Sequence, residues 1–192
     1  MIKLSKFDQV ILGSGSPRRQ ALLSGLDIAF TKEVREIDES FPADLPRHEV
    51  AEYLAKLKAE AWSDKELSGK LLLTADTVVV LDEAILGKPQ SAEEGKEMLR
   101  RMSGKMHLVY TGVCLRTEDK LHSFTDKTEV HFKPLSEEEI EHYITKYKPF
   151  DKAGSYGAQE FLGYIAIQHL NGSYFNVMGL PVHRVWEALV MI

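Results

Sequence analysis

The sequence predicts an α/β fold with a mixed, twisted β-sheet and flanking helices, and three observations carry this prediction. Short apolar runs of strand length alternate along the chain with stretches of helical periodicity. Capping residues, glycines and prolines mark the boundaries between them. The apolar run at 78–81 turns at Asp82 and Glu83 and returns over 84–86, which predicts an antiparallel hairpin. Interleaved strands and helices that include a hairpin indicate a mixed sheet.

The first half of the chain alternates expected strands with expected helices. The apolar run 10–12 stops at Gly13, which predicts a short buried strand. Ser16 and Pro17 follow, and because serine is a good N-cap and proline fits the first turn, we expect a helix to begin there. The other expected elements are strand 28–34, helix 47–67, strand 71–81 and the return strand 84–86.

The second half begins and ends with helices. Ser91 is followed three residues later by Glu94, the pattern of a capping box, which predicts a helix over 91–102. Ser136 begins another expected helix, whose acidic first turn suits the positive end of the helix dipole. The remaining elements are strands 106–116 and 121–132, helix 136–147, a glycine-rich loop at 151–157, strand 164–170, a loop at 171–179 and helix 181–191.

Composition narrows the class of protein. The 192 residues include 24 Lys+Arg and 29 Asp+Glu, a net charge of −5, whereas proteins that coat nucleic-acid polymers normally have a basic excess. The single cysteine, Cys114, cannot form an internal disulfide, and the charged first nine residues do not resemble a secretory signal, which predicts a cytoplasmic location. No segment approaches the roughly 18 apolar residues of a membrane span, so no membrane partner is expected. The length suits one domain over 1–192.

Small residues stand between the first expected strand and the first expected helix. The stretch Gly13–Ser16, which includes Ser14, allows the backbone to approach a ligand, and the helix start presents free N–H groups to an anion. Arg18 and Arg19 add two guanidinium groups suited to phosphate. A capped helix with two solvated arginines would explain the same residues, so this motif alone leaves both readings open.

Asp76 and Thr77 stand in the middle of an apolar strand. Polar side chains are costly there unless they have partners. Apolar residues continue on both sides, which favours a carboxylate that binds a metal or acts as a base over a simple strand end.

Four single residues give weaker signals. Lys88 lies between a glycine and a proline that fix its backbone, although a plain turn has the same pattern. Lys58 follows a core position of its helix, where an ordinary solvated lysine fits as well. Glu39, in an acidic run, offers the oxygen ligand that Mg²⁺ or Mn²⁺ prefers, yet charge runs are usually solvated. Gln159 ends a loop whose composition suits reading of a planar ring, and suits a bland surface loop equally.

Nine short stretches, which follow one another along nearly the whole chain, together resemble a known protein family. They are Leu12–Leu23, Leu54–Ala59, Ala75–Val79, Gly87–Pro89, Met102–Gly104 with His107, Tyr110–Val113, Asp151–Gly157, Asn171–Tyr174 and Gly179–Pro181. Each is weak evidence alone. As an ordered set they resemble the Maf family of nucleoside triphosphate pyrophosphatases, first named for septum formation.

The resemblance implies an ITPase-like α/β fold, with two lobes around a central cleft and a homodimer as a frequent assembly. It also implies metal-dependent hydrolysis of a nucleoside triphosphate to the monophosphate and pyrophosphate, with Mg²⁺, Mn²⁺ or Co²⁺ as cofactor. The Gly154–Gln159 loop resembles the branch that acts on dTTP and UTP. The branch that acts on 7-methyl-GTP has a glutamate in place of the glutamine.

The resemblance also assigns roles to single residues. The catalytic aspartate falls on Asp76 and a second acidic residue on the metal side falls on Glu39. Phosphate-handling residues fall on Ser14, Arg18, Lys58 and Lys88, and the positions linked to base choice fall on Arg18, Thr77 and Gln159. Three positions depart from the usual pattern: Gly13 replaces an alanine, and Ala158 and Glu160 stand where the branch often has isoleucine and glycine.

The chemistry of the substrate fits these residue types. A triphosphate carries about four negative charges, so its site needs several cations and a metal. We expect Asp76, with a divalent ion, to activate the attacking water. Lys58, Lys88 and Arg18 are expected to stabilise the triphosphate and its leaving group.

Three other functions remain as alternatives at this point. The true substrate is a modified nucleotide in the first, such as 5-methyl-UTP, pseudo-UTP or 5-methyl-CTP, because a pocket separates a methyl group by only about 1–3 kcal/mol. The second is a cell-division regulator that binds nucleotide with little turnover. The third, a nucleic-acid-binding module, needs a broad basic face with stacking aromatic residues.

Overall fold

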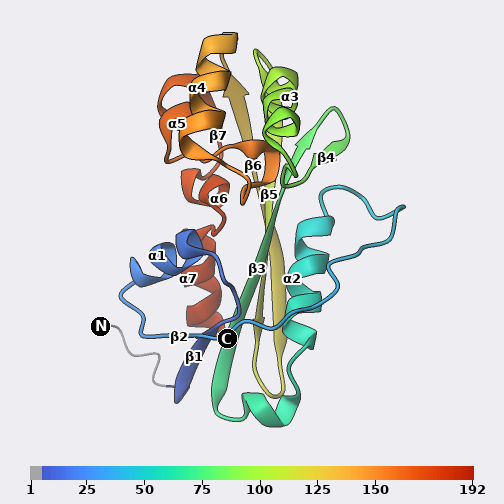
Figure 1. The fold of residues 1–192 in the computed structure, drawn as a ribbon. Helices are drawn as coiled ribbons and strands as arrows, with labels where there is room; N and C mark the ends of the chain where they lie inside the picture. The colour runs from blue at the N-terminus through green and yellow to red at the C-terminus, as the bar shows by residue number, and fades with distance from the viewer. Residues whose placement is uncertain (1–5) are drawn as a thin grey trace. The chain divides into compact units, whose positions relative to one another are not determined.

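The computed structural model describes residues 6–192, so the first five residues of the charged N-terminal stretch lie outside the described part. The chain folds as two compact units, each with its own packing (Figure 1). The first unit comprises the chain up to Asp76 together with Thr111–Asp126 and Gly179–Ile192. The second comprises Thr77–Tyr110 and Lys127–Met178.

The strands form one mixed sheet, as the sequence predicts. The strand order is β2 (Thr31–Lys32), β1 (Gln9–Leu12), β3 (Lys70–Leu81), β5 (Met106–Arg116), β6 (Leu121–Phe132) and β7 (Ile167–Asn171). Strand β1 pairs in parallel with both β2 and β3. Strand β4 (Ala84–Leu86) pairs antiparallel with β3, and β7 pairs antiparallel with β6. The expected hairpin at Asp82 and Glu83 is confirmed, and both turn residues have positive φ angles.

In the first unit, helix α2 (Val50–Glu60) packs on the strands. Its Ala55 and Ala59 join Ile11 of β1, Leu72 of β3 and Cys114 of β5 in one buried cluster. Burial raises the pKa of the Cys114 thiol to about 12, so the thiol stays protonated at neutral pH. The other helices of this unit are α1 (Pro17–Ser24), the 3-10 turn η1 (Asp64–Leu67) and α7 (Val182–Met191).

Helix α2 lies against the backbone of β5 at Gly112. A Cβ atom built on Gly112 would lie 2.2 Å from the carbonyl carbon of Ala51 and 2.2 Å from the backbone nitrogen of Glu52. The helix approaches the strand this closely because glycine has no side chain. The Glu52 carboxylate, next in the helix, accepts hydrogen bonds from Ser123 Oγ (2.7 Å) and Thr125 Oγ1 (3.0 Å) of β6. Gly112 and Glu52 together fix where α2 sits within its unit.

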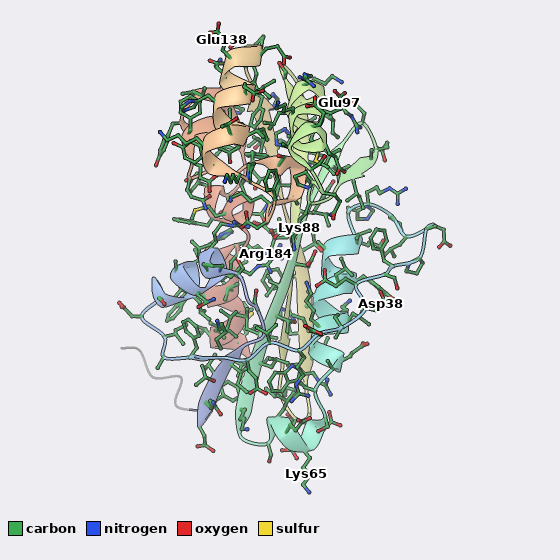
Figure 2. The ribbon with its side chains drawn as sticks, viewed as in Figure 1. Asp38, Lys65, Lys88, Glu97, Glu138 and Arg184 are labelled. Atoms are coloured by element: carbon green, nitrogen blue, oxygen red, sulfur yellow. The ribbon has the colours of Figure 1, made fainter. Side chains whose placement is uncertain are left out.

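The second unit has an apolar core of its own. It contains α3 (Ala92–Met102), α4 (Glu137–Tyr147), α5 (Phe161–Ala166), α6 (Tyr174–Met178) and the 3-10 turn η2 (Ala153–Ser155). Leu99, Met102, Ile140, Tyr143 and Phe132 are among its buried residues. The outer faces of α3 and α4 are charged, and Glu97 and Glu138 are exposed there (Figure 2). No helix within residues 6–192 is long and apolar enough to span a membrane.

Most helix and strand boundaries agree with the sequence, and the exceptions have local causes. The expected helix 47–67 divides into α2 and η1, because Ser63 and Glu66 form a capping box that starts a new turn. The expected capping box of α3 is only half formed: Ser91 Oγ accepts from Glu94 N (3.1 Å), but the Glu94 carboxylate accepts from Gln90 N (2.7 Å). Ser136 and Glu139 form a complete capping box on α4.

The expected strand 28–34 shrinks to the two residues of β2. The expected strand 164–170 is wrong at its start, because Phe161–Ala166 is helix α5 and β7 begins only at Ile167. The expected loop 171–179 contains the short helix α6.

The structure gives a physical reason for glycine at position 13, where the resemblance implies an alanine. A Cβ atom at Gly13 would lie 2.7 Å from Cγ2 of Thr74. Thr74 cannot easily turn away, because its hydroxyl donates a buried hydrogen bond of 2.6 Å to the carbonyl of Ala55. Glycine at 13 and threonine at 74 therefore fit one another as a pair.

Replacing Gly13 by alanine is expected to lower the free energy of unfolding by about 1–3 kcal/mol, the usual cost of overpacking. Thr74→Ser keeps the hydroxyl and removes the obstructing methyl group, so Gly13→Ala in that background should cost less. Denaturant unfolding of the two single variants and the double variant measures this coupling. An equal cost in both backgrounds would show that Thr74 is not the obstacle.

Candidate functional site

The loop between β1 and α1 is ordered by its serines. Ser14 is buried, and its Oγ accepts a hydrogen bond from the backbone nitrogen of Ser16 (3.3 Å). Ser16 is the N-cap of α1, and its Oγ accepts from the backbone nitrogen of Arg19 (3.4 Å). Pro17 occupies the first turn, as expected from the sequence.

The structure ties Arg19 to Ser14. Its guanidinium donates to Ser14 Oγ (3.3 Å) and to the carbonyl of Gly179 (2.8 Å). Burial lowers the pKa of Arg19, the nearby Asp76 and Glu39 carboxylates oppose that shift, and Arg18 adds to it. The group therefore lies within electrostatic reach of both acids that the sequence singles out. Arg18 itself is half-buried.

A signal for Arg19 exists in the sequence. Arg19 precedes Leu22 and Leu23, the buried residues of α1, by three and four positions, which places it on their side of the helix. The motif of two adjacent arginines does not distinguish Arg18 from Arg19, and the role of Arg18 is assigned by the family resemblance.

Three of the expected residues meet at one lysine of the first unit. Lys58 extends from α2, and its Nζ lies 2.5 Å from Asp76 Oδ1 of β3 and 3.0 Å from Glu39 Oε1 of the acidic loop. The side chains of Lys58 and Asp76 are only 16% and 14% exposed, whereas that of Glu39 is 53% exposed. Asp38, the exposed neighbour of Glu39 labelled in Figure 2, instead accepts from the backbone nitrogen of Ser40 (3.0 Å). The polar centre of β3 thus has the charged partners that its burial requires.

The carboxylates of Asp76 and Glu39 both face the ammonium of Lys58, and carboxylate oxygens are the type of ligand that divalent cations prefer. Mg²⁺ and Mn²⁺ prefer oxygen ligands, and Mg²⁺ is typically held by one or two carboxylates with the remaining ligands from phosphates and water. Within residues 6–192, no group of three or more His, Cys, Asp or Glu side chains could hold a metal ion. The carboxylates of Asp76 and Glu39 are thus the two oxygen ligands that could be offered to a cation near Lys58 in the first unit.

Three of the residues expected at the site, Thr77, Lys88 and Gln159, belong to the second unit. Thr77 is its first residue, directly after Asp76 on β3. Lys88 is exposed in the turn after β4 (Figure 2), where the carbonyl of Gly87 accepts a hydrogen bond of 3.0 Å from the backbone nitrogen of Gly154. This bond joins the Lys88 turn to the glycine-rich loop.

Gln159 stands near the end of the glycine-rich loop and carries an unused acceptor. Its Oε1 is buried, and none of the described residues gives it a hydrogen bond. Buried polar atoms without a partner are rare and costly, so they need a physical explanation. A ligand that donates a hydrogen bond would satisfy this oxygen.

Comparison with known proteins agrees with the stretches quoted above. The family model described as Maf-like protein matches residues 9–192. A dTTP/UTP pyrophosphatase of Porphyromonas gingivalis is 52% identical over 184 residues, which cover 94% of this chain and 92% of that protein. Proteins with the same name from Bacteroides thetaiotaomicron and Parabacteroides distasonis are 49% and 45% identical, over 94% and 98% of each chain.

Solved structures resemble this chain at much lower identity. A nucleoside-triphosphatase, or dITP/XTP pyrophosphatase, of Mycobacterium abscessus is 13% identical, with a TM-score of 0.47 over 95% of each chain. The Ham1 protein of Staphylococcus aureus is 11% identical, with a TM-score of 0.44 over 65% of this chain and 72% of that one. The assignment of a mixed α/β fold rests on the strand order given above.

Proposed function

Because the chain belongs to the Maf-like protein family, we propose that it hydrolyses the nucleoside triphosphates dTTP and UTP to the monophosphate and pyrophosphate. The observation that carries the proposal is the group of Lys58, Asp76 and Glu39, with Arg19 within electrostatic reach of both acids. A triphosphate needs cations, and an attacking water needs a base beside them. This group supplies both.

In the proposed reaction, the oxygen of a water molecule attacks the α-phosphorus. The bond between the α-phosphorus and the oxygen bridging to the β-phosphorus breaks, and pyrophosphate leaves with that electron pair. Asp76 takes the proton of the attacking water. A divalent cation held by Asp76 and Glu39 would neutralise phosphate charge and make the water more acidic.

The basic residues are proposed to bind the triphosphate. Lys58 already faces two carboxylates, so a bound phosphate would share its ammonium with them. Arg19 adds a guanidinium that Ser14 and Gly179 hold in place. Arg18 and Lys88 are proposed to complete the positive charge around the phosphates.

Gln159 is proposed to read the base. Uracil and thymine present an N–H donor at N3 and a carbonyl acceptor at O4, and a carboxamide can pair with both. The buried Oε1 of Gln159 is the acceptor that the N3–H group would satisfy. Thr77 is proposed as a second contact to the pyrimidine.

Replacing Gln159 by glutamate is expected to change the ranking of substrates. A carboxylate only accepts hydrogen bonds, so it loses the donor for O4 but suits the two adjacent N–H groups of guanine. We expect kcat/KM for dTTP and UTP to fall at least about tenfold relative to GTP, because a site that pairs polar groups rejects mismatches strongly. Pyrophosphate release across the three nucleotides measures this ranking.

The matched control for this prediction is Gln168→Glu, the same chemical change at an exposed position of β7. It should leave the ranking of the three nucleotides as it is. An unchanged ranking in Gln159→Glu as well would remove Gln159 from base selection.

The same assay, with and without Mn²⁺, separates the proposed function from its alternatives. Including 5-methyl-UTP, pseudo-UTP and 5-methyl-CTP tests whether a modified pyrimidine is the better substrate. Binding of nucleotide without release of pyrophosphate under all conditions would instead support a regulator of cell division with little turnover.

The domain organisation, cellular location and partners of the enzyme are proposed from other observations. The family model spans both units, which supports one functional domain. The single, buried and free Cys114 supports a cytoplasmic location. The net charge of −5 argues against a nucleic-acid polymer as partner. The family resemblance supports a homodimer.

A further inference from the structure

Gln159 lies within a tight turn of the second unit. The turn comprises Gly157–Glu160, and the backbone nitrogen of Glu160 donates to the carbonyl of Gly157 (3.1 Å). Gln159 is therefore the third residue of a four-residue turn. The direction in which its side chain leaves the backbone depends on how firmly this turn is held.

Tyr143 of α4 ties both ends of the turn together. Its hydroxyl accepts a hydrogen bond from the backbone nitrogen of Gly157 (3.0 Å) and donates one to Glu160 Oε2. The tyrosine is fully buried, and burial together with the Glu160 carboxylate raises its pKa, so the hydroxyl keeps its proton and remains a donor. The Tyr143 hydroxyl thus connects the first and last residues of the turn to each other and to helix α4.

Two further side chains hold the residues on either side of Gln159. Lys152 Nζ lies 3.0 Å from Glu160 Oε1 and 2.8 Å from Asp151 Oδ1, and the side chain of Lys152 is only 9% exposed. The hydroxyl of Tyr174 donates to the carbonyl of Ala158 (3.3 Å). Gly157 leaves no room for a side chain, because a Cβ atom there would lie 2.9 Å from Cδ of Glu160 and 3.1 Å from Cε of Lys152.

The side-chain acceptor of Gln159 differs from the other residues of the turn in its contacts. Gly157, Ala158 and Glu160 are each held by a hydrogen bond or ion pair from outside the turn, whereas Oε1 of Gln159 is buried without a partner among the described residues. The backbone is anchored on both sides of a side chain whose acceptor is left for a ligand. This is the arrangement that a preorganised recognition group requires.

An amide needs such anchoring to distinguish pyrimidines. Uracil and thymine offer a donor at N3 and an acceptor at position 4, and cytosine offers the reverse. A carboxamide that is free to rotate by half a turn satisfies either pattern. Selection of uracil or thymine therefore depends on the room that the buried amide has to turn about its Cγ–Cδ bond, and the position of the anchored backbone sets that room.

We propose that Tyr143, Glu160 and Lys152 are positioning residues that fix Gln159 for bases carrying an N3–H donor, and thereby set selection of dTTP and UTP over CTP. This inference rests on the proposed function of Gln159. Within the turn, the Glu160 carboxylate contacts both Tyr143 of α4 and Lys152.

The test is Tyr143→Phe, which removes the hydroxyl and both its hydrogen bonds but keeps the buried ring. The ratio of kcat/KM for dTTP to that for CTP should fall at least about tenfold, a typical effect of leaving polar groups without partners. The fall should come from KM for dTTP, with kcat changed less than about threefold, because the hydrolytic residues are elsewhere in the chain. Thermal unfolding checks that the variant is folded.

The matched control is Tyr147→Phe, one turn further along α4, where the ring of Tyr147 stacks on that of Tyr143. It should leave the ratio unchanged. If Tyr143→Phe does not fold, Glu160→Gln replaces it: the amide still accepts from Tyr143 but loses its charge for Lys152, so a smaller fall in the ratio is expected. A wild-type ratio in Tyr143→Phe, or in Glu160→Gln where that variant replaces it, would overturn the inference.

A double variant distinguishes failure of this inference from failure of the proposed function. Gln159→Ala alone should lower the dTTP/CTP ratio, and adding Tyr143→Phe should lower it no further, because the tyrosine acts through the glutamine. An additive effect would contradict the positioning role and leave the proposed function standing. A wild-type ratio in Gln159→Ala would contradict the base-reading role itself.

Discussion

Asp76→Asn is expected to lower kcat for dTTP by about 10²–10⁴-fold, the usual contribution of a general base, and to leave nucleotide binding largely intact. Asparagine has nearly the same shape and still accepts a hydrogen bond from Lys58, which lies 2.5 Å from Asp76 Oδ1. It cannot take the proton of the attacking water, and it is a weaker metal ligand. Steady-state release of pyrophosphate gives kcat, and calorimetric titration with a non-hydrolysable nucleotide gives the affinity.

Asp82→Asn is the matched control, because Asp82 is an exposed aspartate of the β3–β4 turn that pairs with Lys105. Its kcat should equal that of the unaltered chain. Activity of Asp76→Asn within about tenfold of the unaltered chain would remove Asp76 from the role of base. Loss of binding together with turnover would instead assign Asp76 to holding the substrate.

Gly112→Ala is expected to destabilise the chain more than Gly13→Ala does. The new Cβ atom would lie 2.2 Å from backbone atoms of Ala51 and Glu52, and backbone cannot rotate away as a side chain can. The loss should exceed the usual 1–3 kcal/mol of overpacking, so we expect at least about 3 kcal/mol. For a chain of this size, that corresponds to a fall in Tm of about 6–12 °C.

Differential scanning calorimetry measures the effect, and Gly87→Ala is the control, because a Cβ atom there meets nothing within 4 Å. The Tm of Gly87→Ala should stay within about 2 °C of the original, as for most substitutions in open space. Activity carries a second expectation: Lys58 extends from α2, so a helix displaced by the added methyl group should also lose turnover. A stable Gly112→Ala variant would show that α2 and β5 separate at little cost.

Local signals predicted much of the fold. The caps at Ser16 and Ser136 and the long apolar strands are local patterns, and α1, α4, β3, β5 and β6 agree closely with them. The errors arose where a distant or neighbouring group decides the outcome. The Glu94 carboxylate bonds Gln90 instead of closing its capping box. Phe161–Ala166 forms a helix that packs so closely on the Gly157–Glu160 turn that Gly163 has no room for a Cβ atom beside Ala158.

The candidate site also combines residues that a local signal predicted with contacts that form only when distant segments meet. Asp76 stood out because a buried carboxylate needs partners, and the structure gives it Lys58. That Glu39 shares the same ammonium could not be read from the sequence, because the acidic loop and α2 meet only in the folded chain. Tyr143 gave no signal as a positioning residue, since a tyrosine on the apolar face of a helix is indistinguishable from ordinary core until its hydroxyl partners are known.

The boundary between the two units at Asp76 and Thr77 has a consequence for how the family evolves. On the proposed roles, activation of the water depends on Asp76 and Glu39 in the first unit. Base choice depends on residues of the second unit, which are Thr77 and, within 127–178, Gln159 with its anchors. A lineage can therefore acquire a new nucleotide preference through substitutions in that segment while purifying selection preserves the reaction. A one-residue insertion in β3 would instead turn every later side chain of the strand to the opposite face, and selection should eliminate it. Substrate range is expected to diverge among descendants faster than catalysis.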